Sequence, residues 1–561
     1  MMRIHRLVRA RTLAVSLTLA LPAAAGAATQ TTPPHPAHQT APAAGPPAEL
    51  FDNLGSYSHP ISTHSAEAQR YFDQGLSLLY GFNHDEAERS FREAARRDPE
   101  CGICWWGVAL TLGPNINLPI DPERNARAVE AIDRARSLAG TETEAERAYI
   151  TALATRYSRD PHADRAALDQ SYARAMRELS LRYPDDLDAA TLYAEAMMDL
   201  RPWKLWTPDG APEEGTEAIL ATLESVMRRN PNHPGANHYY IHAVEASNQP
   251  ERAAASAERL PALVPGAGHL VHMPAHIQMR TGDYRGAVDS NDRAARVDEE
   301  YLKRSGSSGT YPTMYYNHNL HFLALAAMMT GEHARAARAA EQVSASVAGL
   351  LPDMQMVEFS APTNLLVAVR FGRWDEVLTA KEPAHGLPTS RAIRHYARGV
   401  AYAAKGELAA AKLERQALAA ARAVIPAEHV WNIQPAAPVI RVAAEVLDAR
   451  IAAAEGARDA ALAAWRRAVE AQDALAYDQP PAWYYPVRES LGAEMMQTGR
   501  PAEAEQVFRD DLKRNPANPR SLLGLAESLA AQDRVDAAAA ARREFDAAWK
   551  RADVTVTLKD F

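Results

Sequence analysis

Residues 68–101 read AQRYFDQGLSLLYGFNHDEAERSFREAARRDPEC, and this stretch fixes the pattern from which the fold follows. Small and aromatic residues stand at positions 4, 8, 20, 24, 27 and 32 of the 34-residue frame: Tyr71, Gly75, Ala87, Phe91, Ala94 and Pro99. Residues 485–518 repeat the frame, and residues 519–552 follow at the same spacing. Because small residues let two helices approach closely, the pattern predicts repeated pairs of antiparallel helices.

The 34-residue pattern resembles the tetratricopeptide repeat (TPR), and the resemblance covers most of residues 68–552. Further copies occupy residues 392–425 and 442–475, and weaker ones begin near 102, 187, 234, 268, 317 and 358. The resemblance implies an all-α, right-handed superhelical solenoid, since one repeat cannot bury its own apolar face but stacked repeats can. Insertions at 113–124, 201–215 and 302–316 interrupt the stack, and we expect them to cover the mouth of the concave groove.

Composition narrows the possible partners. The chain has 561 residues, 47% of them apolar, and a formal net charge of −9. A chain of this size and composition can bury a large core, and its abundant alanine and other helix formers favour helices over strands. The mild acidity and the absence of a basic stripe argue against a nucleic-acid partner.

The N-terminus has the pattern of a secretory signal. Four arginines precede the apolar run LAVSLTLAL, and Ala25-Gly26-Ala27 offers a small-residue cleavage site. We therefore expect a signal peptide over 1–27, a Pro/Ala-rich linker over 28–60, the solenoid over 61–552 and a tail over 553–561. No later apolar run is long enough to predict a stable membrane span. The protein is expected to be exported, most simply to the periplasm, and the resemblance is to exported bacterial TPR proteins.

Both cysteines of the chain, Cys101 and Cys104, lie in CGICWW. In an oxidising compartment this pair is a candidate for a local disulfide. Attachment of haem would require a histidine directly after the second cysteine, and Trp105 stands there instead.

Residues 269–276 read HLVHMPAH and carry three histidines at positions 2, 5 and 9 of their repeat. In TPR proteins these positions, together with position 12, line the concave groove. The repeat before it places two histidines and a glutamate at positions 5, 9 and 12, and the repeat after it places two histidines at positions 2 and 5. The candidate metal ligands are therefore His238, His242, Glu245, His269, His272, His276, His318 and His321. We expect His238, His242, His272, His276 and His318 to converge in one pocket.

Imidazole binds copper, zinc, iron or nickel. The cluster has no cysteine nearby, which argues against a structural zinc site with thiolate ligands. Six or seven histidines could hold two metals, and a three-plus-three arrangement would resemble type 3 copper proteins in ligand type but not in fold. Copper, zinc and iron are the expected candidates. The alternative is a polar groove whose histidines bind a peptide or one another. HYYIH has the histidine spacing of zincin proteases, but Tyr239 replaces their catalytic glutamate.

Other polar residues on the same faces give weaker indications. Arg280, at position 13, is a candidate for binding an anionic group of a substrate. Glu195 and Asp199 could orient histidines from behind. Two functions remain open from the sequence: an exported protein that binds a metal ion, a peptide or a protein partner, and a metal-dependent oxidoreductase or hydrolase with its site in the groove.

Overall fold

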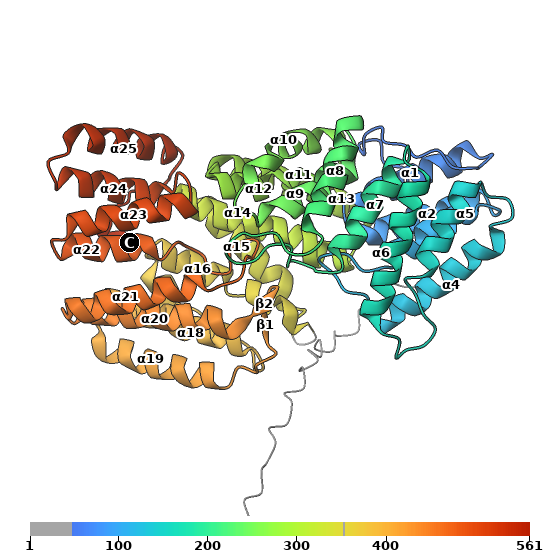
Figure 1. Cartoon of the computed structure of the whole chain (residues 1–561). Coiled ribbons are helices and arrows are strands. Elements are labelled where there is room, and N and C mark those ends of the chain that lie inside the picture. The colour runs from blue at the N-terminus through green and yellow to red at the C-terminus, as the bar shows by residue number, and fades with distance from the viewer. Residues whose placement is uncertain (1–47, 352–353) are drawn as a thin grey trace, which may run out of the picture. The chain divides into compact units, whose positions relative to one another are not determined.

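The computed structural model describes residues 48–351 and 354–561 and is built almost entirely of helices (Figure 1). The signal peptide expected over 1–27 lies outside the described residues. The helices of the first half are α1 (Ala66–Tyr80), α2 (His84–Arg97), α3 (Gly102–Thr111), α4 (Pro122–Leu138), α5 (Glu144–Ala154), α6 (Arg165–Arg182), α7 (Leu187–Met198), α8 (Thr216–Arg229), α9 (Pro234–Glu245), α10 (Ala254–Leu263), α11 (Gly268–His272), α12 (Pro274–Thr281) and α13 (Tyr284–Ser305).

The second half continues in the same manner and adds one short hairpin. Its helices are α14 (Asn317–Thr330), α15 (His333–Ala348), α16 (Thr363–Arg370), α17 (Trp374–Thr379), α18 (Pro388–Ala404), α19 (Leu408–Ala423), α20 (Ala436–Ala454), α21 (Arg458–Asp473), α22 (Arg488–Gln497), α23 (Pro501–Arg514), α24 (Pro519–Ala530) and α25 (Val535–Ala548). The hairpin pairs β1 (Val430–Trp431) with β2 (Gln434–Pro435). Short helical turns cover Pro250–Ala253, Pro312–Tyr316, Gln355–Ser360 and Leu558–Asp560.

Successive helices pack as TPR-like pairs, and the residues that define the repeat explain why. A Cβ atom added at Gly75 would lie 2.9 Å from the ring of Phe91, and one at Gly107 would lie 2.4 Å from it. The aromatic residue of helix α2 therefore fills the space that glycine leaves on the helices before and after it. Phe508 has the same relation to Gly492 and Gly524. Close packing at these points joins each pair to the next.

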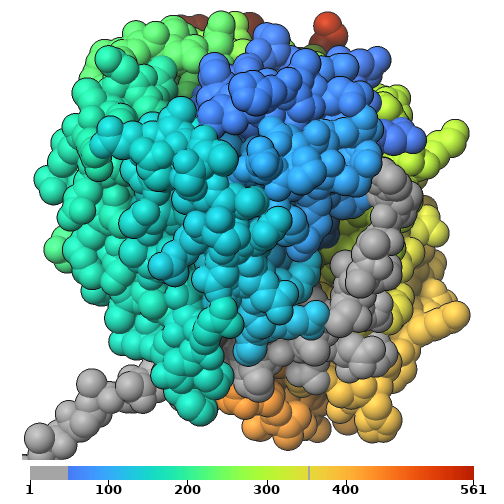
Figure 2. All heavy atoms as spheres, turned by 90° about the vertical axis from the view of Figure 1, so that its right-hand side faces the viewer, coloured from blue at the N-terminus to red at the C-terminus, as the bar shows by residue number. Residues whose placement is uncertain are grey.

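The pairs stack into an all-α solenoid, which confirms the fold class expected from the repeat. The pair α5/α6, for which we identified no repeat, fits between α3/α4 and α7/α8. Figure 2 turns the N-terminal pairs toward the viewer, and their side chains pack closely over this face. The C-terminal end contacts the middle of the chain, because the amide of Asp553 donates to the carbonyl of Gly331 and Arg551 pairs with Asp289.

A linker was predicted over residues 28–60, but the structure shows that the last part of this range is packed. Residues 28–47 lie outside the described residues, but residues 48–60 pack against the solenoid. Leu54 is buried, the amide of Phe51 donates to the side chain of Gln74, and Tyr57 reaches Asp188. Hydrogen bonds to side chains of the helices, rather than chain composition, decide the position of this segment. Among the described residues, no helix is both long and apolar enough to cross a membrane.

Candidate metal centre

Seven histidines predicted to be ligands lie on α9, α11, α12 and α14. Residues 269–276 form almost one continuous helix, which Pro274 divides because proline has no amide to donate to the carbonyl of Leu270. The spacing of three and four residues keeps His269, His272 and His276 on one side of this segment. Helix α9 packs against α12, so that the histidines of α9 lie close to those of residues 269–276.

The structure brings six of the seven histidines into two groups of three. His238, His242 and His269 form triad A, in which one ring nitrogen from each residue lies within 4.8 Å of the other two. The second group, triad B, meets the same criterion: His272, His276 and His318. The triads are neighbours, since ring centroids of His242 and His276 are 5.3 Å apart. The five residues expected to converge in one pocket therefore lie together, divided between two triads.

Hydrogen bonds on the outer side of the triads set the orientation of four rings. Nδ1 of His238 donates to the carbonyl of Tyr80 at 2.6 Å. Nδ1 of His272 donates to Oδ1 of Asn291 at 2.6 Å, and the amide group of Asn291 donates to the carbonyl of Ala287, which fixes Oδ1 as the acceptor. Each of these nitrogens therefore carries its hydrogen, because a carbonyl oxygen can only accept.

Glu245 joins the two triads. Its Oε1 accepts from Nδ1 of His242 at 2.6 Å, and its Oε2 accepts from Nδ1 of His276 at 2.6 Å. The hydroxyl of Tyr477 also donates to Oε2, at 2.5 Å. Glu245, predicted as a ligand, forms a third group with His242 and His276 in which one ligand atom of each residue lies within 4.8 Å of the other two. Both of its oxygens face the outer nitrogens of these histidines. A carboxylate in this position orients the rings and makes them stronger ligands.

With a hydrogen on Nδ1, the inner nitrogen of each of these four rings carries a lone pair in the neutral form of the ring. Nε2 of His272 and Nε2 of His276 lie only 2.7 Å apart. In triad A, Nε2 of His242 is buried and has no hydrogen-bond partner among the described residues. Nε2 of His238 lies 3.2 Å from Nε2 of His269, which can donate to it because, within this part of the chain, Nδ1 of His269 is the nitrogen without a partner. In triad B, two lone pairs 2.7 Å apart repel each other unless a cation or a shared proton lies between them.

Five of the six triad histidines are shielded from water, and His318 of triad B is partly exposed. His238, His242, His269, His272 and His276 are each at most 4% exposed. Aromatic side chains cover them: the ring of Phe82 lies 4.6 Å from that of His238, and Phe322 lies 4.8 Å from His276.

Two of the predicted insertions supply the rest of the cover. From the insertion 201–215, Trp203 contacts His242, and from the insertion 302–316, Tyr315 contacts His269. The insertions therefore close the concave side at these repeats, as expected from their position in the sequence.

Burial also sets the charge state of the rings. It lowers the pKa of His238, His269, His272 and His318 well below the ordinary value, and neighbouring histidines lower it further. Burial alone would raise the pKa of Glu245, but His276 and His242 outweigh it and hold this pKa below the usual range. Burial thus favours the neutral form of these four histidines beside the carboxylate of Glu245, and neutral imidazole is the form in which histidine binds metals.

Several predicted residues lie elsewhere. His321 belongs to neither triad, packs against Phe359, and has a pKa that burial lowers to about 4. Glu195 and Asp199 do not face the histidines; they lie beside the buried Arg156, which forms an ion pair with Asp199. The sulfur atoms of Cys101 and Cys104 are bonded to each other at the start of α3.

A cavity of about 250 Å³ adjoins triad B. Its lining includes His276, Met279, Tyr284, Phe322 and Tyr477. Arg280, the predicted substrate-binding residue, also lines this cavity, but two of its N–H groups donate to the carbonyls of Glu245 and Ser247. Of the two triads, only triad B contributes a lining residue to this cavity.

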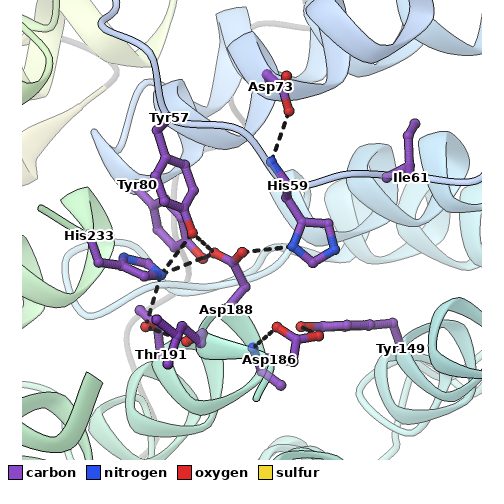
Figure 3. A network of polar contacts seen from close by, with 12 residues as sticks. Tyr57, His59, Ile61, Asp73, Tyr80, Tyr149, Asp186, Asp188, Thr191 and His233 are labelled. Carbon is purple, nitrogen blue, oxygen red and sulfur yellow. Dashed lines mark hydrogen bonds and ion pairs between the residues drawn. The ribbon is translucent and has the colours of Figure 1, made fainter. Parts of the chain in front are cut away.

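A second histidine cluster, which the sequence analysis did not predict, surrounds Asp188 (Figure 3). The carboxylate of Asp188 accepts from the hydroxyls of Tyr57 and Tyr80 and from Nδ1 of His59, and its Oδ1 lies 3.2 Å from Nε2 of His233. Nδ1 of His233 accepts from the amide of Ala236, so its Nε2 carries the hydrogen that faces Asp188. Each polar group here meets a partner of the opposite kind.

Comparison with known proteins yields only distant similarity. No family model matches the chain, and no curated protein resembles it. Similar solved structures include the human IFIT1 dimer with PPP-AAAA, at 13% identity and a TM-score of 0.32, covering 88% of this chain and 92% of that one. They also include the APC/C hetero-tetramer Cut9-Hcn1, at 12% identity and a TM-score of 0.29, covering 82% and 76%, and yeast Tom70, at 12% and 0.28, covering 87% and 92%. At such TM-scores these similarities support no inference about binding or activity.

Proposed function

We propose that the protein binds a pair of transition-metal ions, one in triad A and one in triad B. The observation that carries the proposal is the approach of Nε2 of His272 to Nε2 of His276 at 2.7 Å, while Nδ1 of each donates to an oxygen on the other side of its ring. A metal ion that accepts both lone pairs turns this repulsion into attraction. Histidines whose second nitrogen donates to a carboxylate or carbonyl are the usual ligands of protein-bound metals.

Copper fits the donor set best. Each triad offers three imidazoles, and the carboxylate of Glu245 lies between the two triads. Two monovalent copper ions would leave a smaller net charge in this buried site than two divalent ions, and burial of net charge is costly. Imidazole is a good ligand for copper in either oxidation state.

The burial of the triads favours metal binding over the recognition of a peptide. A peptide in the groove would have to displace Phe82, Trp203 and Tyr315 before it reached the rings. Metal ions need no such contact area, only an entry path. The TPR-like scaffold remains suited to binding a protein partner at its other surfaces.

A metal-dependent enzyme is the second candidate, and the cavity beside His276 favours it. A purely structural or storage site does not need such a cavity at a metal ligand, whereas a small substrate could reach the metal of triad B from this side. A bound metal pair would supply redox or Lewis-acid chemistry there. Tyr477 and Arg280 lie where they would orient a substrate.

The test is the metal content of protein purified without a polyhistidine tag and loaded separately with copper, zinc and iron. We expect two equivalents of copper in the wild type, about one in His238→Ala and about one in His272→Ala, with none in the double variant. His395→Ala, which changes a histidine paired with Glu414 outside both triads, is the matched control and should keep two equivalents. X-ray absorption should show nitrogen ligands at about 2.0 Å and no sulfur.

Failure of all three metals to bind would overturn the proposal, and the histidines would then share a proton. A stoichiometry of two that survives in the double variant would place the metals elsewhere. If zinc or iron binds with the same dependence on the histidines but copper does not, the site stands and the choice of copper is wrong.

We also infer that the protein acts outside the cytoplasm. The pattern of residues 1–27 supports this, and so does the pairing of Cys101 with Cys104, which an oxidising compartment would preserve. Cell fractionation with N-terminal sequencing tests it: the mature chain should begin close to residue 28 and occur in the periplasm. A full-length chain in the cytoplasm would refute export.

A further inference from the structure

A second and larger cavity, of about 550 Å³, lies on the inner side of the C-terminal helix pairs. Residues of α16, α18, α20, α22 and α24 line it, and residues 554–561 form part of its wall. It contains no residue of either histidine triad. It shares Tyr484 and Tyr485 with the cavity beside His276.

Four arginines line this cavity, and two of them, Arg450 and Arg520, form no ion pair within the described residues. Arg370, at the end of α16, forms a bidentate ion pair with Glu489. Arg520, on α24, donates only to the backbone carbonyls of Arg370 and Asp560. Arg450, on α20, lies over the ring of Trp465 at 5.1 Å. Within residues 48–351 and 354–561, no carboxylate forms an ion pair with Arg450 or Arg520.

The other charged groups of the lining do not neutralise these two arginines. Arg458 pairs with Glu494 at 2.9 Å. The carboxylate of Asp560 accepts from the amide and hydroxyl of Thr557, within its own turn. Lys559 adds a further positive charge at an exposed position. The cavity therefore has an excess of positive charge.

Burial makes this excess costly. Arg520 is 3% exposed and Arg370 is 6% exposed. The Nε atoms of Arg370, Arg450 and Arg520 are all buried without a hydrogen-bond partner among the described residues. Burial and the charge of Arg370 lower the pKa of Arg520 to about 9. Arg520, which is buried and has no acidic partner among the described residues, marks a place where an anion would be held strongly, and the half-buried Arg450 adds a second unpaired charge.

The remaining walls are aromatic. The cavity is lined by Tyr396, Trp465, Tyr484, Tyr485 and Phe561, each at most 6% exposed. The planar forks of arginine match a carboxylate, which can accept two parallel hydrogen bonds. Aromatic faces suit a flat apolar body attached to that group.

We infer that this cavity binds an organic carboxylate, with its anionic group at Arg450 and Arg520 and an aromatic or other apolar body against Tyr396, Trp465 and Tyr484. The inference concerns a site separate from the proposed metal pair and does not depend on it. A cavity of about 550 Å³ has room for a ligand larger than a single ring.

Isothermal calorimetry with 1-naphthoate and its neutral isostere 1-naphthamide tests the inference on the full chain. We expect 1-naphthoate to bind at one site and 1-naphthamide to bind at least about tenfold more weakly, because only the acid supplies the missing charge. Arg450→Gln and Arg520→Gln should each weaken 1-naphthoate binding by about tenfold or more. Arg466→Gln is the matched control, since this neighbour of Trp465 is half exposed and lies outside the cavity lining.

Equal binding of acid and amide would overturn the inference, as would unchanged naphthoate binding in both arginine variants. If inorganic phosphate bound as strongly as 1-naphthoate, the aromatic wall would contribute nothing to affinity, and the part of the inference that concerns an apolar ligand body would be wrong. Thermal unfolding without ligand gives an independent measure: Arg450→Gln should be at least as stable as wild type, because it removes repulsion from Arg520. A lower midpoint in Arg450→Gln with unchanged affinity would assign Arg450 to packing on Trp465 and also overturn the inference.

Discussion

Helix α9 takes part in two histidine clusters that differ in how their polar groups are paired. His233 caps its N-terminus and joins the network around Asp188, where Nδ1 accepts from a backbone amide and Nε2 faces a carboxylate. His238 and His242, one and two turns later, direct Nδ1 to an oxygen and turn Nε2 toward other histidines. In the Asp188 network each donor faces an acceptor, whereas in triad B two ring nitrogens with Nδ1 already donating elsewhere face each other at 2.7 Å.

This difference shows that a count of neighbouring histidines and carboxylates does not identify a metal site. His59, Asp186 and Asp188 also lie within 4.8 Å of one another, as the ligands of a metal would. Yet the donors around Asp188 already satisfy it, and burial and hydrogen bonding serve to hold residues 48–65 against the solenoid. What separates the clusters is the direction of the hydrogen bonds and not the residue types.

Asp188→Asn should cause the largest loss of stability, on the order of 3–5 kcal/mol in the free energy of unfolding, while metal content stays unchanged. The substitution leaves His59 without its buried counter-charge and puts an amide group in place of one acceptor oxygen of the network. Urea denaturation measures the loss. Asp186→Asn, two residues away on the same helix end, is the control and should cost about 1 kcal/mol or less, because asparagine caps a helix as well as aspartate. Equal effects of the two substitutions would deny Asp188 its central role.

Glu245→Gln should weaken metal binding by about 10–100-fold without unfolding the protein. The amide group that replaces one carboxylate oxygen can no longer accept from Nδ1, so His242 or His276 loses its fixed orientation. Competition with a chelator measures the affinity. Glu224→Gln, at a carboxylate that accepts from Tyr240 outside the triads, should leave the affinity unchanged. Unaltered affinity in Glu245→Gln would mean that the carboxylate does not support the ligands.

The Asp188 network should lose stability at alkaline pH. Burial lowers the pKa of His59, but the hydrogen bond and charge of Asp188 outweigh it and raise the pKa from 6.5 to about 9. A raised pKa means that this stabilisation is fully present below pH 6.5 and is lost as pH rises through about 9. Over this pH range, the free energy of unfolding of the wild type should therefore fall by on the order of 2 kcal/mol relative to that of His59→Gln. Parallel unfolding profiles for the two proteins would contradict this.

His321→Gln should have the smallest effect, leaving the metal stoichiometry at the wild-type value. His321 holds a groove position in the repeat but packs against Phe359, away from both triads. Mass spectrometry measures the metal content of the loaded variant. His318→Ala, which should lose metal, is measured beside it. Loss of metal in His321→Gln would show that His321 is a ligand, as its position in the repeat predicts, although it lies outside both triads.

The sequence by itself determined the helix pairs and the placing of histidines on α9, α11, α12 and α14. Both follow from local periodicity: the 34-residue repeat gives the pairs, and the 3.6-residue turn puts residues three and four apart on one face. His238, His242, His269, His272, His276 and His318 could therefore be predicted as one group. The close packing of Gly75 and Phe91 was likewise expected from the repeat.

Only the tertiary structure decided how these histidines divide and which groups orient them. Tyr80, Asn291 and Tyr477 had no signal in the sequence, because the first contacts His238 across 158 residues and the last contacts Glu245 across 232. The same holds for His59, which is joined to Asp188 across 129 residues. Local periodicity fixes the face on which a side chain lies. The stacking and curvature of distant helix pairs fix what it meets there, because those contacts depend on small rotations summed over many repeats.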